Sequence, residues 1–293
     1  MEIRTLRHFL AVAREENMTR AAETLHISQP TLSKELKALE SELGKKLFTR
    51  SSFRMHLTDE GTLLRDRAAD LVDMADRIES EFLTLSDVTG GNLYLGLAES
   101  YQIRYLAREI KRMKEAYPGL HTHITSGDTE QVADKLDKGL LDFAVLAETP
   151  NLRKYNALMF PDEDVWGLVM PTDDPLARKP VIRFEDLLGL PLFCSAQAWN
   201  GEIAKWCGKR KEKLSLEGSF KLAYNGSVFV REGLGYLLSF DRLVDTSEGS
   251  GLLFRPLAPR LTTKLYLVWK KEPAFSPIAE RFLQRIHRAF LPL

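Results

Sequence analysis

The residues most able to do recognition chemistry lie along one face of a predicted helix over residues 29–43. They carry amides, hydroxyls and amines, in the order Gln29, Thr31, Ser33, Lys34 and Lys37. Amide and hydroxyl groups hydrogen-bond to base-pair edges in the major groove of DNA, and lysines neutralise phosphates. The face therefore favours DNA binding, with an ordinary pair of packed helices in a small helical domain as the alternative.

A shorter helix must hold this face outward, and the preceding residues predict one over about 19–25. Thr19 and Ser28 are placed as N-caps of the two helices, where a hydroxyl accepts from the free amides of a first turn. The connecting turn has His26 where such turns often use glycine, and histidine adopts positive φ more readily than most residues. Residues 18–37 are thus predicted to form a helix-turn-helix.

A short hairpin is predicted after the second helix. Gly44 is a C-cap signal, and the hairpin follows it over residues 45–61, KKLFTRSSFRMHLTDEG. Its cationic side chains are Lys45, Lys46, Arg50 and Arg54. The whole chain has 41 basic and 41 acidic residues. Because it carries no net charge, any affinity for DNA must be local to this region.

The pattern changes over residues 58–85. Apolar side chains recur at alternating spacings of four and three: Leu64, Ala68, Leu71, Ala75, Ile78, Phe82 and Leu85. A narrow seam with a 3.5-residue period is typical of a helix that pairs with another in a coiled coil. We predict a linker and dimerisation helix over 59–89, followed by a glycine-rich break. A long surface helix packed on its own domain is the alternative.

These segments resemble a known family. The N-terminal winged helix-turn-helix of the LysR-type transcriptional regulators is similar to LRHFLAVAREENMTRAAETLHISQPTLSKELKALESELGKKLFTR followed by LTDEG. The match runs from Met1 to about Gly61 without an evident gap. The resemblance implies a bacterial cytoplasmic regulator that binds a roughly palindromic operator as a dimer or tetramer. It also implies a small-molecule effector and contact with RNA polymerase.

The C-terminal region alternates strands and helices, which predicts a parallel α/β sheet. Strands are expected near residues 92–98, 120–125, 142–147, 164–171, 190–195, 220–224, 237–240 and 265–271. Helices are expected over 101–117, 129–138, 198–209, 227–232 and 277–290. Two α/β lobes with two crossings, near 160–163 and 256–262, fit the LysR-type effector domain, which resembles periplasmic binding proteins.

The expected fold class is therefore α/β, with an N-terminal winged helix-turn-helix, a long linker helix and a C-terminal two-lobed effector domain. The expected domains are 1–58 for DNA binding, 59–89 for the linker helix and 92–293 for the effector. Within the last, lobe I takes 92–161 and 264–293, and lobe II takes 162–263.

Polar residues gather where the predicted strands end. In such folds ligands bind beyond the carboxyl ends of the strands, where helix N-termini also point. The predicted effector contacts are Ser100, Tyr101, Thr129, Glu148, Ser195, Gln197 and Asn225. Their side chains and nearby backbone N–H groups would hold a carboxylate or another small polar ligand. Ser100 and Thr129 also have a simpler interpretation as N-caps, and a cap beside a cleft remains available to a ligand.

Other chemistries lack the residues they need. The six histidines show no metal-ligand spacing, and no phosphate-binding loop, nucleophile elbow or complete dinucleotide fingerprint occurs. No apolar run approaches the roughly 18–20 residues of a membrane span, and no signal peptide is evident, so a cytoplasmic location is expected. Nothing near Cys194 or Cys207 signals a lowered thiol pKa, which disfavours the peroxide-sensing pair found in some LysR-like proteins.

The sequence thus predicts a ligand-responsive DNA-binding regulator rather than an enzyme, with no cofactor beyond a non-covalent effector. The residues expected at the major groove are Gln29, Pro30, Thr31, Ser33 and Lys34, and those expected at phosphates or the minor groove are Lys37, Arg50 and Arg54. Two alternatives stay open. One is a solute-binding module whose helical head contacts only proteins, and the other is an α/β enzyme with an appended helical domain, for which no catalytic constellation is found.

Overall fold

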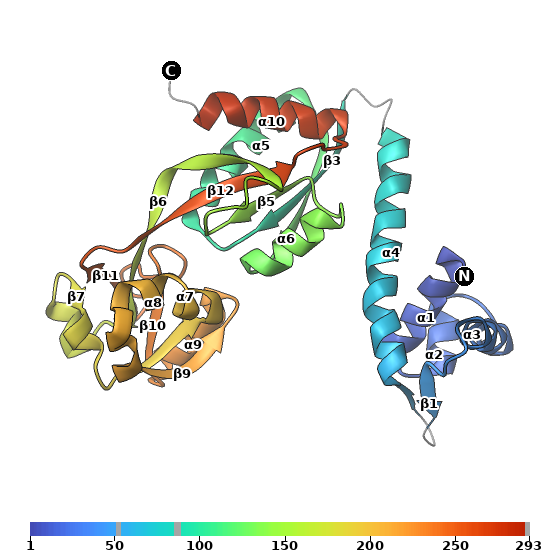
Figure 1. Ribbon diagram of the computed structural model, residues 1–293, viewed down its shortest axis with the longest axis horizontal. Helices are drawn as coiled ribbons and strands as arrows, with labels where there is room; N and C mark the ends of the chain where they lie inside the picture. The colour runs from blue at the N-terminus through green and yellow to red at the C-terminus, as the bar shows by residue number, and fades with distance from the viewer. Residues whose placement is uncertain (51–53, 85–88, 291–293) are drawn as a thin grey trace. The chain divides into compact units, whose positions relative to one another are not determined.

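The structure is a computed structural model that describes residues 1–50, 54–84 and 89–290, without the side chains of Arg50 and Thr84. The chain divides into two compact units, Met1–Thr84 and Leu85–Leu293. Figure 1 colours the first from blue to cyan and the second from green to red. No helix in the described ranges is long and apolar enough to cross a membrane.

The first unit packs helices around a small core, with a two-stranded hairpin at one side. Its elements are α1 (Ile3–Glu15), α2 (Met18–Thr24), α3 (Gln29–Leu43), β1 (Phe48–Arg50), β2 (Met55–Leu57) and α4 (Asp59–Thr84). Apolar residues at helical spacing on each helix meet in this core, where Phe9, Leu32 and Ala68 are fully buried. Ala68 belongs to α4, so the first turns of the long helix pack on the helix-turn-helix.

Lobe I of the second unit is a sheet covered by helices on both faces. Its elements are β3 (Gly90–Leu97), β4 (Gly119–Ser126), β5 (Phe143–Leu146), α5 (Arg104–Ala116), α6 (Thr129–Asp137) and α10 (Pro277–Phe290). The three strands run parallel in the order β4-β3-β5. Alternate residues of β3 face opposite sides: Leu93 and Leu95 pack beneath α5 and α10, whereas Tyr94 packs with residues of α6. Figure 1 shows these two helix layers.

Lobe II repeats the arrangement. Its elements are β7 (Ile182–Arg183), β8 (Pro191–Ser195), β9 (Ser215–Phe220), β10 (Tyr236–Phe240), β11 (Leu252–Ala258), α7 (Ala196–Asn200), α8 (Glu202–Cys207) and α9 (Ala223–Arg231). Strands β10, β8 and β9 run parallel in that order. Apolar residues on the two sides of this sheet form two separate clusters, one including Leu192 and Ile203 and the other including Val230 and Leu237.

Two long strands join the lobes. β6 (Tyr155–Pro171) runs through both, and β12 (Thr262–Lys270) lies antiparallel beside it, from Tyr155 opposite Lys270 to Val165 opposite Thr262. Figure 1 shows them as the continuous ribbons between the lobes. The sheet is therefore mixed: the predicted parallel order is right within β3–β5 and β8–β10 and wrong for the crossing strands.

Several predicted elements differ from those observed. The strand predicted at 220–224 lies at Ser215–Phe220, and β7 and β11 were not predicted. In β9 every residue is exposed or half-buried, so this edge strand lacks the apolar alternation on which the prediction relied. The helix predicted over 198–209 is broken at Gly201, whose φ and ψ of −102° and −100° separate α7 from α8.

Candidate functional site

Local signals fix both ends of α3. The Ser28 hydroxyl caps its first turn by accepting from the Thr31 N–H at 3.3 Å. Gly44 ends the helix with φ 64°, a left-handed conformation that glycine adopts without strain. In the preceding turn His26 has φ 54°. The prediction of a helix over 29–43 is confirmed.

The cap of α2 differs from the expected one. Asn17 Oδ1 accepts from the N–H groups of Thr19 and Arg20 at 2.9 and 3.0 Å. Because the helix begins at Met18, Thr19 already lies in the first turn and donates its amide. The predicted Thr19 cap is therefore wrong, although the helix lies within one residue of its predicted position.

The outer face of α3 carries the predicted polar side chains. Gln29, Pro30, Thr31, Lys34 and Lys37 are exposed, Ser33 is half-buried, and Leu32, Leu36 and Leu39 are buried on the opposite face. The Thr31 hydroxyl shares a 2.7 Å hydrogen bond with Ser28. Across the described chain no hydrogen bond engages the side chains of Gln29, Lys34 or Lys37. These three side chains can therefore meet a duplex without breaking a hydrogen bond within the described chain.

Glu40 ties α3 to the hairpin. Its carboxylate accepts from the Leu47 N–H at 2.9 Å and from Lys46 Nζ at 2.8 Å. Burial acts to raise the pKa of Glu40, but the hydrogen bonds from Lys46 and the backbone outweigh it and lower the pKa. Of the predicted hairpin cations, Arg54 is exposed, and the Arg50 side chain lies outside the described residues.

The seam of α4 divides into two parts. Ala68 is fully buried in the helix-turn-helix core. Further along, Leu71, Ile78 and Phe82 are 45%, 47% and 72% exposed. The first part of α4 therefore packs on its own domain, as the alternative interpretation expected. The second part presents an exposed apolar surface that a partner helix could cover. Leu85, the last seam position, lies outside the described residues.

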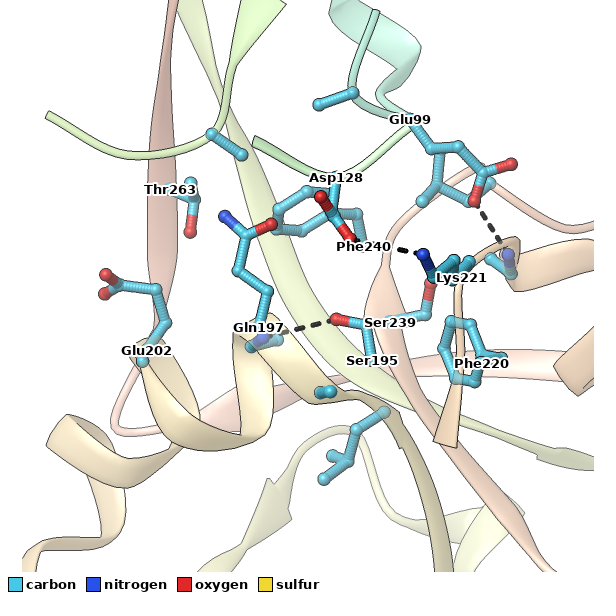
Figure 2. Close-up of a pocket in the computed structure, with 18 of the residues that line it drawn as sticks. Glu99, Asp128, Ser195, Gln197, Glu202, Phe220, Lys221, Ser239, Phe240 and Thr263 are labelled. Carbon is cyan, nitrogen blue, oxygen red and sulfur yellow. Dashed lines mark hydrogen bonds and ion pairs between the residues drawn. The ribbon is translucent and has the colours of Figure 1, made fainter. Parts of the chain in front are cut away.

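A cavity of about 440 Å³ lies between the two lobes. Figure 2 shows side chains reaching it from both sides. Of the predicted contacts, Glu148, Ser195 and Gln197 line the cavity, whereas Ser100, Tyr101, Thr129 and Asn225 are absent from its lining.

Gln197 and Thr129 bridge the lobes beside this cavity. Gln197 Nε2 donates to Thr129 Oγ1 at 2.9 Å, and the Thr129 N–H donates to Gln197 Oε1 at 3.2 Å. Thr129 is thus one contact removed from the lining. The Ser195 hydroxyl caps α7 by accepting from the Ala198 N–H at 3.3 Å.

Two further interlobe contacts involve Glu99 and Lys221, which were not predicted from the sequence. Glu99 Oε2 accepts from the Ala223 N–H at 2.7 Å, and Lys221 Nζ lies 3.8 Å from Asp128 Oδ2. Figure 2 draws both contacts as dashed lines. Burial raises the pKa of Glu99, and the Ala223 N–H opposes that shift.

The missed residues are explained by where the strands end. β3 ends at Leu97, so Ala98 and Glu99 line the cavity instead of Ser100 and Tyr101. The chain turns into α9 at Ala223, so Lys221 lines the cavity in place of Asn225, which is exposed on the helix. The predicted strand ends lie within one residue of the observed ends except at β9, where they differ by four, and this was sufficient to find the cavity but not its lining.

Ser100 belongs instead to a buried network at the lobe crossing. Its hydroxyl donates to Asp164 Oδ2 at 2.5 Å and accepts from the Gln102 N–H at 2.9 Å. Gln102 Nε2 donates to Asp164 Oδ1 at 3.2 Å. Burial raises the pKa of Asp164 to about 6, although the hydrogen bonds from Ser100 and Gln102 oppose the shift. This network ties the start of α5 to strand β6.

Neither cysteine is placed for redox chemistry. Cys194 and Cys207 are buried in the core of lobe II, at 0% and 3% exposure. Burial raises the pKa of Cys194 to about 12 and also raises that of Cys207. A buried, protonated thiol is a poor nucleophile. Within the described residues no group of three or more His, Cys, Asp or Glu could hold a metal ion.

Comparison with known proteins decides the family. A model described as the LysR substrate binding domain matches residues 86–291, and one described as a bacterial regulatory helix-turn-helix protein of the lysR family matches residues 3–62. The chain is a LysR-type transcriptional regulator. It binds DNA through its N-terminal domain and carries a substrate-binding domain behind it; its relatives are regulators rather than enzymes.

Two curated relatives illustrate the range of this family. The uncharacterized HTH-type transcriptional regulator YnfL of Escherichia coli K12 is 27% identical to this LysR-type regulator over 295 residues, covering 98% of this chain and 97% of YnfL. The hydrogen peroxide-inducible genes activator of Dickeya chrysanthemi is 30% identical over 193 residues, covering 66% and 63%. Among solved structures, full-length CbnR in complex with its target DNA shares the fold, with a TM-score of 0.77, 19% identity and coverage of 99% and 100%.

Proposed function

We propose that this LysR-type regulator reads an operator through the exposed face of α3 and that a small molecule in the interlobe cavity controls the reading. The observation that carries the proposal is the cavity itself. It lies between lobes held together by side-chain contacts from both, so a ligand there would meet both lobes at once.

Reading of the operator rests on the division of chemistry along α3. Gln29 and Ser33 offer an amide and a hydroxyl for base edges, and Lys37 offers a charge for phosphate. The helix dipole places partial positive charge at the N-terminal end of α3, where Gln29 lies, and this charge attracts the DNA phosphates. We propose that Gln29 and Ser33 set the specificity for the operator and that Lys37 contributes affinity for any DNA.

Two copies are proposed to act together. The exposed apolar residues of α4, Leu71, Ile78 and Phe82, keep the spacing of a coiled-coil seam. Pairing along this seam would hold two reading heads at a fixed separation and match them to a roughly palindromic operator, as a dimer or within a tetramer. We further propose a cytoplasmic location, contact with RNA polymerase, and no cofactor besides the effector.

Control by the effector follows from differential affinity. A ligand changes the balance between two arrangements only if it binds one better than the other. The Gln197–Thr129 pair and the Glu99–Ala223 hydrogen bond join the two lobes and would break if the lobes separated, so a ligand that adds to these contacts would favour closure. We propose that closure of lobe I on lobe II then favours one of the two DNA-bound arrangements of the assembly.

The test compares two threonine variants of the full-length chain. Thr129→Val removes the acceptor for Gln197, whereas Thr122→Val makes the same change on β4, away from the cavity. A duplex is first selected from random DNA, and small molecules that stabilise the chain are then tested for a change in its footprint. We expect Thr129→Val to alter the response and Thr122→Val to keep it. Absence of any responsive molecule, or equal responses from both variants, would overturn effector control.

A further inference from the structure

The charges around the interlobe cavity indicate what kind of ligand it takes, provided that the proposed effector role is right. Four carboxylates line the cavity, those of Glu99, Asp128, Glu148 and Glu202, and two ammonium groups face them, those of Lys205 and Lys221. The formal charge of the lining is therefore −2. Figure 2 shows Glu99, Asp128 and Glu202 among the labelled side chains.

Both ammonium groups already have carboxylate partners. Lys205 Nζ lies 2.8 Å from Glu202 Oε1, and Lys221 Nζ lies 3.8 Å from Asp128 Oδ2. Within each pair the two charges neutralise each other. The excess negative charge of the lining therefore comes from Glu99 and Glu148. An incoming carboxylate would have to compete with a carboxylate of the chain for either lysine.

Several backbone donors beside the cavity are already occupied. Helix N-termini attract anions through N–H groups that have no other acceptor. Around this cavity four such groups donate to side chains of the protein: Thr129 to Gln197 at 3.2 Å, Gln131 to Asp128 at 2.9 Å, Ala198 to Ser195 at 3.3 Å and Ala223 to Glu99 at 2.7 Å. Two of these four acceptors are themselves carboxylates, so a bound anion would lose donors and gain repulsion.

Two lining carboxylates, those of Glu148 and Glu99, have no ion pair among the described residues, and the more buried of the two is Glu99. It is half-buried, and only its Oε2 is engaged, by the Ala223 N–H. Within the described ranges Glu99 has no ion pair, and its Oε1 has no hydrogen-bond partner. A carboxylate held in place by one backbone donor, with its second oxygen open, is suited to a charge-assisted hydrogen bond from a cation.

Apolar side chains form a large part of the wall, beside the hydroxyl and amide side chains of Ser195, Gln197, Ser219, Ser239 and Thr263. Trp166, Phe220, Leu238, Phe240 and Leu243 line the cavity. Trp166 and Phe240 pack with ring centroids 4.3 Å apart, and the indole N–H is already donated to Thr263 Oγ1 at 2.8 Å. These five apolar side chains offer rings and methyl groups on which an apolar body can pack. A volume of about 440 Å³ suits a small organic molecule.

We propose that the effector is a small organic cation, a protonated amine on an apolar body, whose ammonium group donates to Glu99 while its body packs on Trp166 and Phe240. Aromatic side chains near the charge add a favourable cation–π contribution. The sequence predicted a carboxylate or another small polar ligand, and the net negative charge of the lining favours a cation over a carboxylate.

The test uses three sets of compounds built on the same aryl and alkyl bodies, one ending in a primary amine, one in a carboxylate and one in an alcohol. The 2-phenylethylamine, phenylacetate and 2-phenylethanol trio is the first member. Thermal unfolding of the full-length chain ranks the sets, and calorimetry gives Kd. We expect the amines to stabilise the chain more than their matched acids and alcohols.

Two isosteric variants locate the contact. Glu99→Gln keeps an acceptor for the Ala223 N–H and removes the charge, so the best amine should bind about tenfold or more weakly. Glu115→Gln removes an exposed carboxylate from α5, outside the cavity, and should leave Kd unchanged. Equal weakening in both variants, or none in Glu99→Gln, would overturn the assignment of Glu99.

The outcomes separate this inference from the proposed function. If acids stabilise the chain and amines do not, the cationic ligand is wrong and an effector site still stands. If amines bind at the cavity but leave the operator footprint unchanged, the ligand class is right and effector control is wrong. If no set stabilises the chain, both are overturned.

Discussion

Replacing Asp164 with asparagine should make the stability of the chain less dependent on pH. Asp164 is 3% exposed at the lobe crossing and accepts from Ser100 and Gln102. An asparagine side chain at this position keeps the shape and loses the charge. Its amide can donate to Gln102 Oε1, a buried atom without a hydrogen-bond partner among the described residues, after rotation of the Gln102 side chain.

The magnitude follows from the pKa of Asp164. Burial raises it from an ordinary value of 3.8 to about 6, so the folded chain binds this proton more tightly than the unfolded chain. The contribution of Asp164 to stability is therefore smallest above pH 6 and grows as pH falls through 6 towards 4. Between pH 7 and pH 5 the wild type gains about 1.3 kcal/mol from this group, out of about 3 kcal/mol for the full shift.

Urea unfolding of the wild type and of Asp164→Asn at several pH values isolates this contribution. The other titratable groups are shared by both proteins, so their effects cancel in the difference between the two unfolding free energies. The stability of the variant relative to the wild type should fall by about 1.3 kcal/mol from pH 7 to pH 5. Asp173→Asn, which removes an exposed carboxylate just beyond the end of β6, is the control and should give a flat difference. A flat difference for Asp164→Asn as well would refute the argument from burial.

Three other predictions concern DNA, assembly and the thiols. Gln29→Ala should lose about 1–3 kcal/mol of discrimination between a selected duplex and a random one, whereas Lys37→Ala should weaken both alike and lower the salt slope by about one. Gel shifts at graded salt measure both, and equal losses on the two duplexes for Gln29→Ala would contradict its role at base edges. Phe82→Asp should shift the chain towards monomer in sedimentation; an unchanged sedimentation coefficient would place the interface elsewhere. Cys194 and Cys207 should react slowly with a thiol reagent in the folded chain and fully after unfolding, and rapid oxidation of the folded chain by peroxide would contradict their burial.

The helix-turn-helix could be predicted because its signals are local. Ser28, the buried stripe of α3 and Gly44 lie within one helix, so sequence spacing alone fixes what each does. The Thr19 cap failed for a similarly local reason: Asn17 and Thr19 both suit an N-cap, and the helix uses the earlier one. An error of one residue in the start of the helix therefore assigned the N-cap to Thr19 instead of Asn17, although the helix itself was predicted.

The cavity was harder to predict because its lining is assembled across the lobes. Three of the seven predicted contacts line it, and the residues missed, including Glu99 and Lys221, owe their place to strand ends and to partners more than 90 residues away in sequence. The sign of the cavity's charge was out of reach for the same reason. It depends on which charged side chains the two lobes bring to the cavity, and periodicity within one lobe cannot reveal the residues that the other lobe supplies.

The seam of α4 shows how one sequence pattern serves two surfaces. A helix of 26 residues is roughly 39 Å long, more than a small helix-turn-helix core can cover. The same heptad spacing therefore continues from Ala68, which fills that core, to Phe82, which is 72% exposed. Burying a phenylalanine side chain is worth about 1.5–3 kcal/mol, so leaving Ile78 and Phe82 open costs stability unless a second helix covers them. Pairing of two α4 helices would remove that cost. The distance between the two DNA-reading domains would then depend on the position along α4 at which the helix-turn-helix core ends.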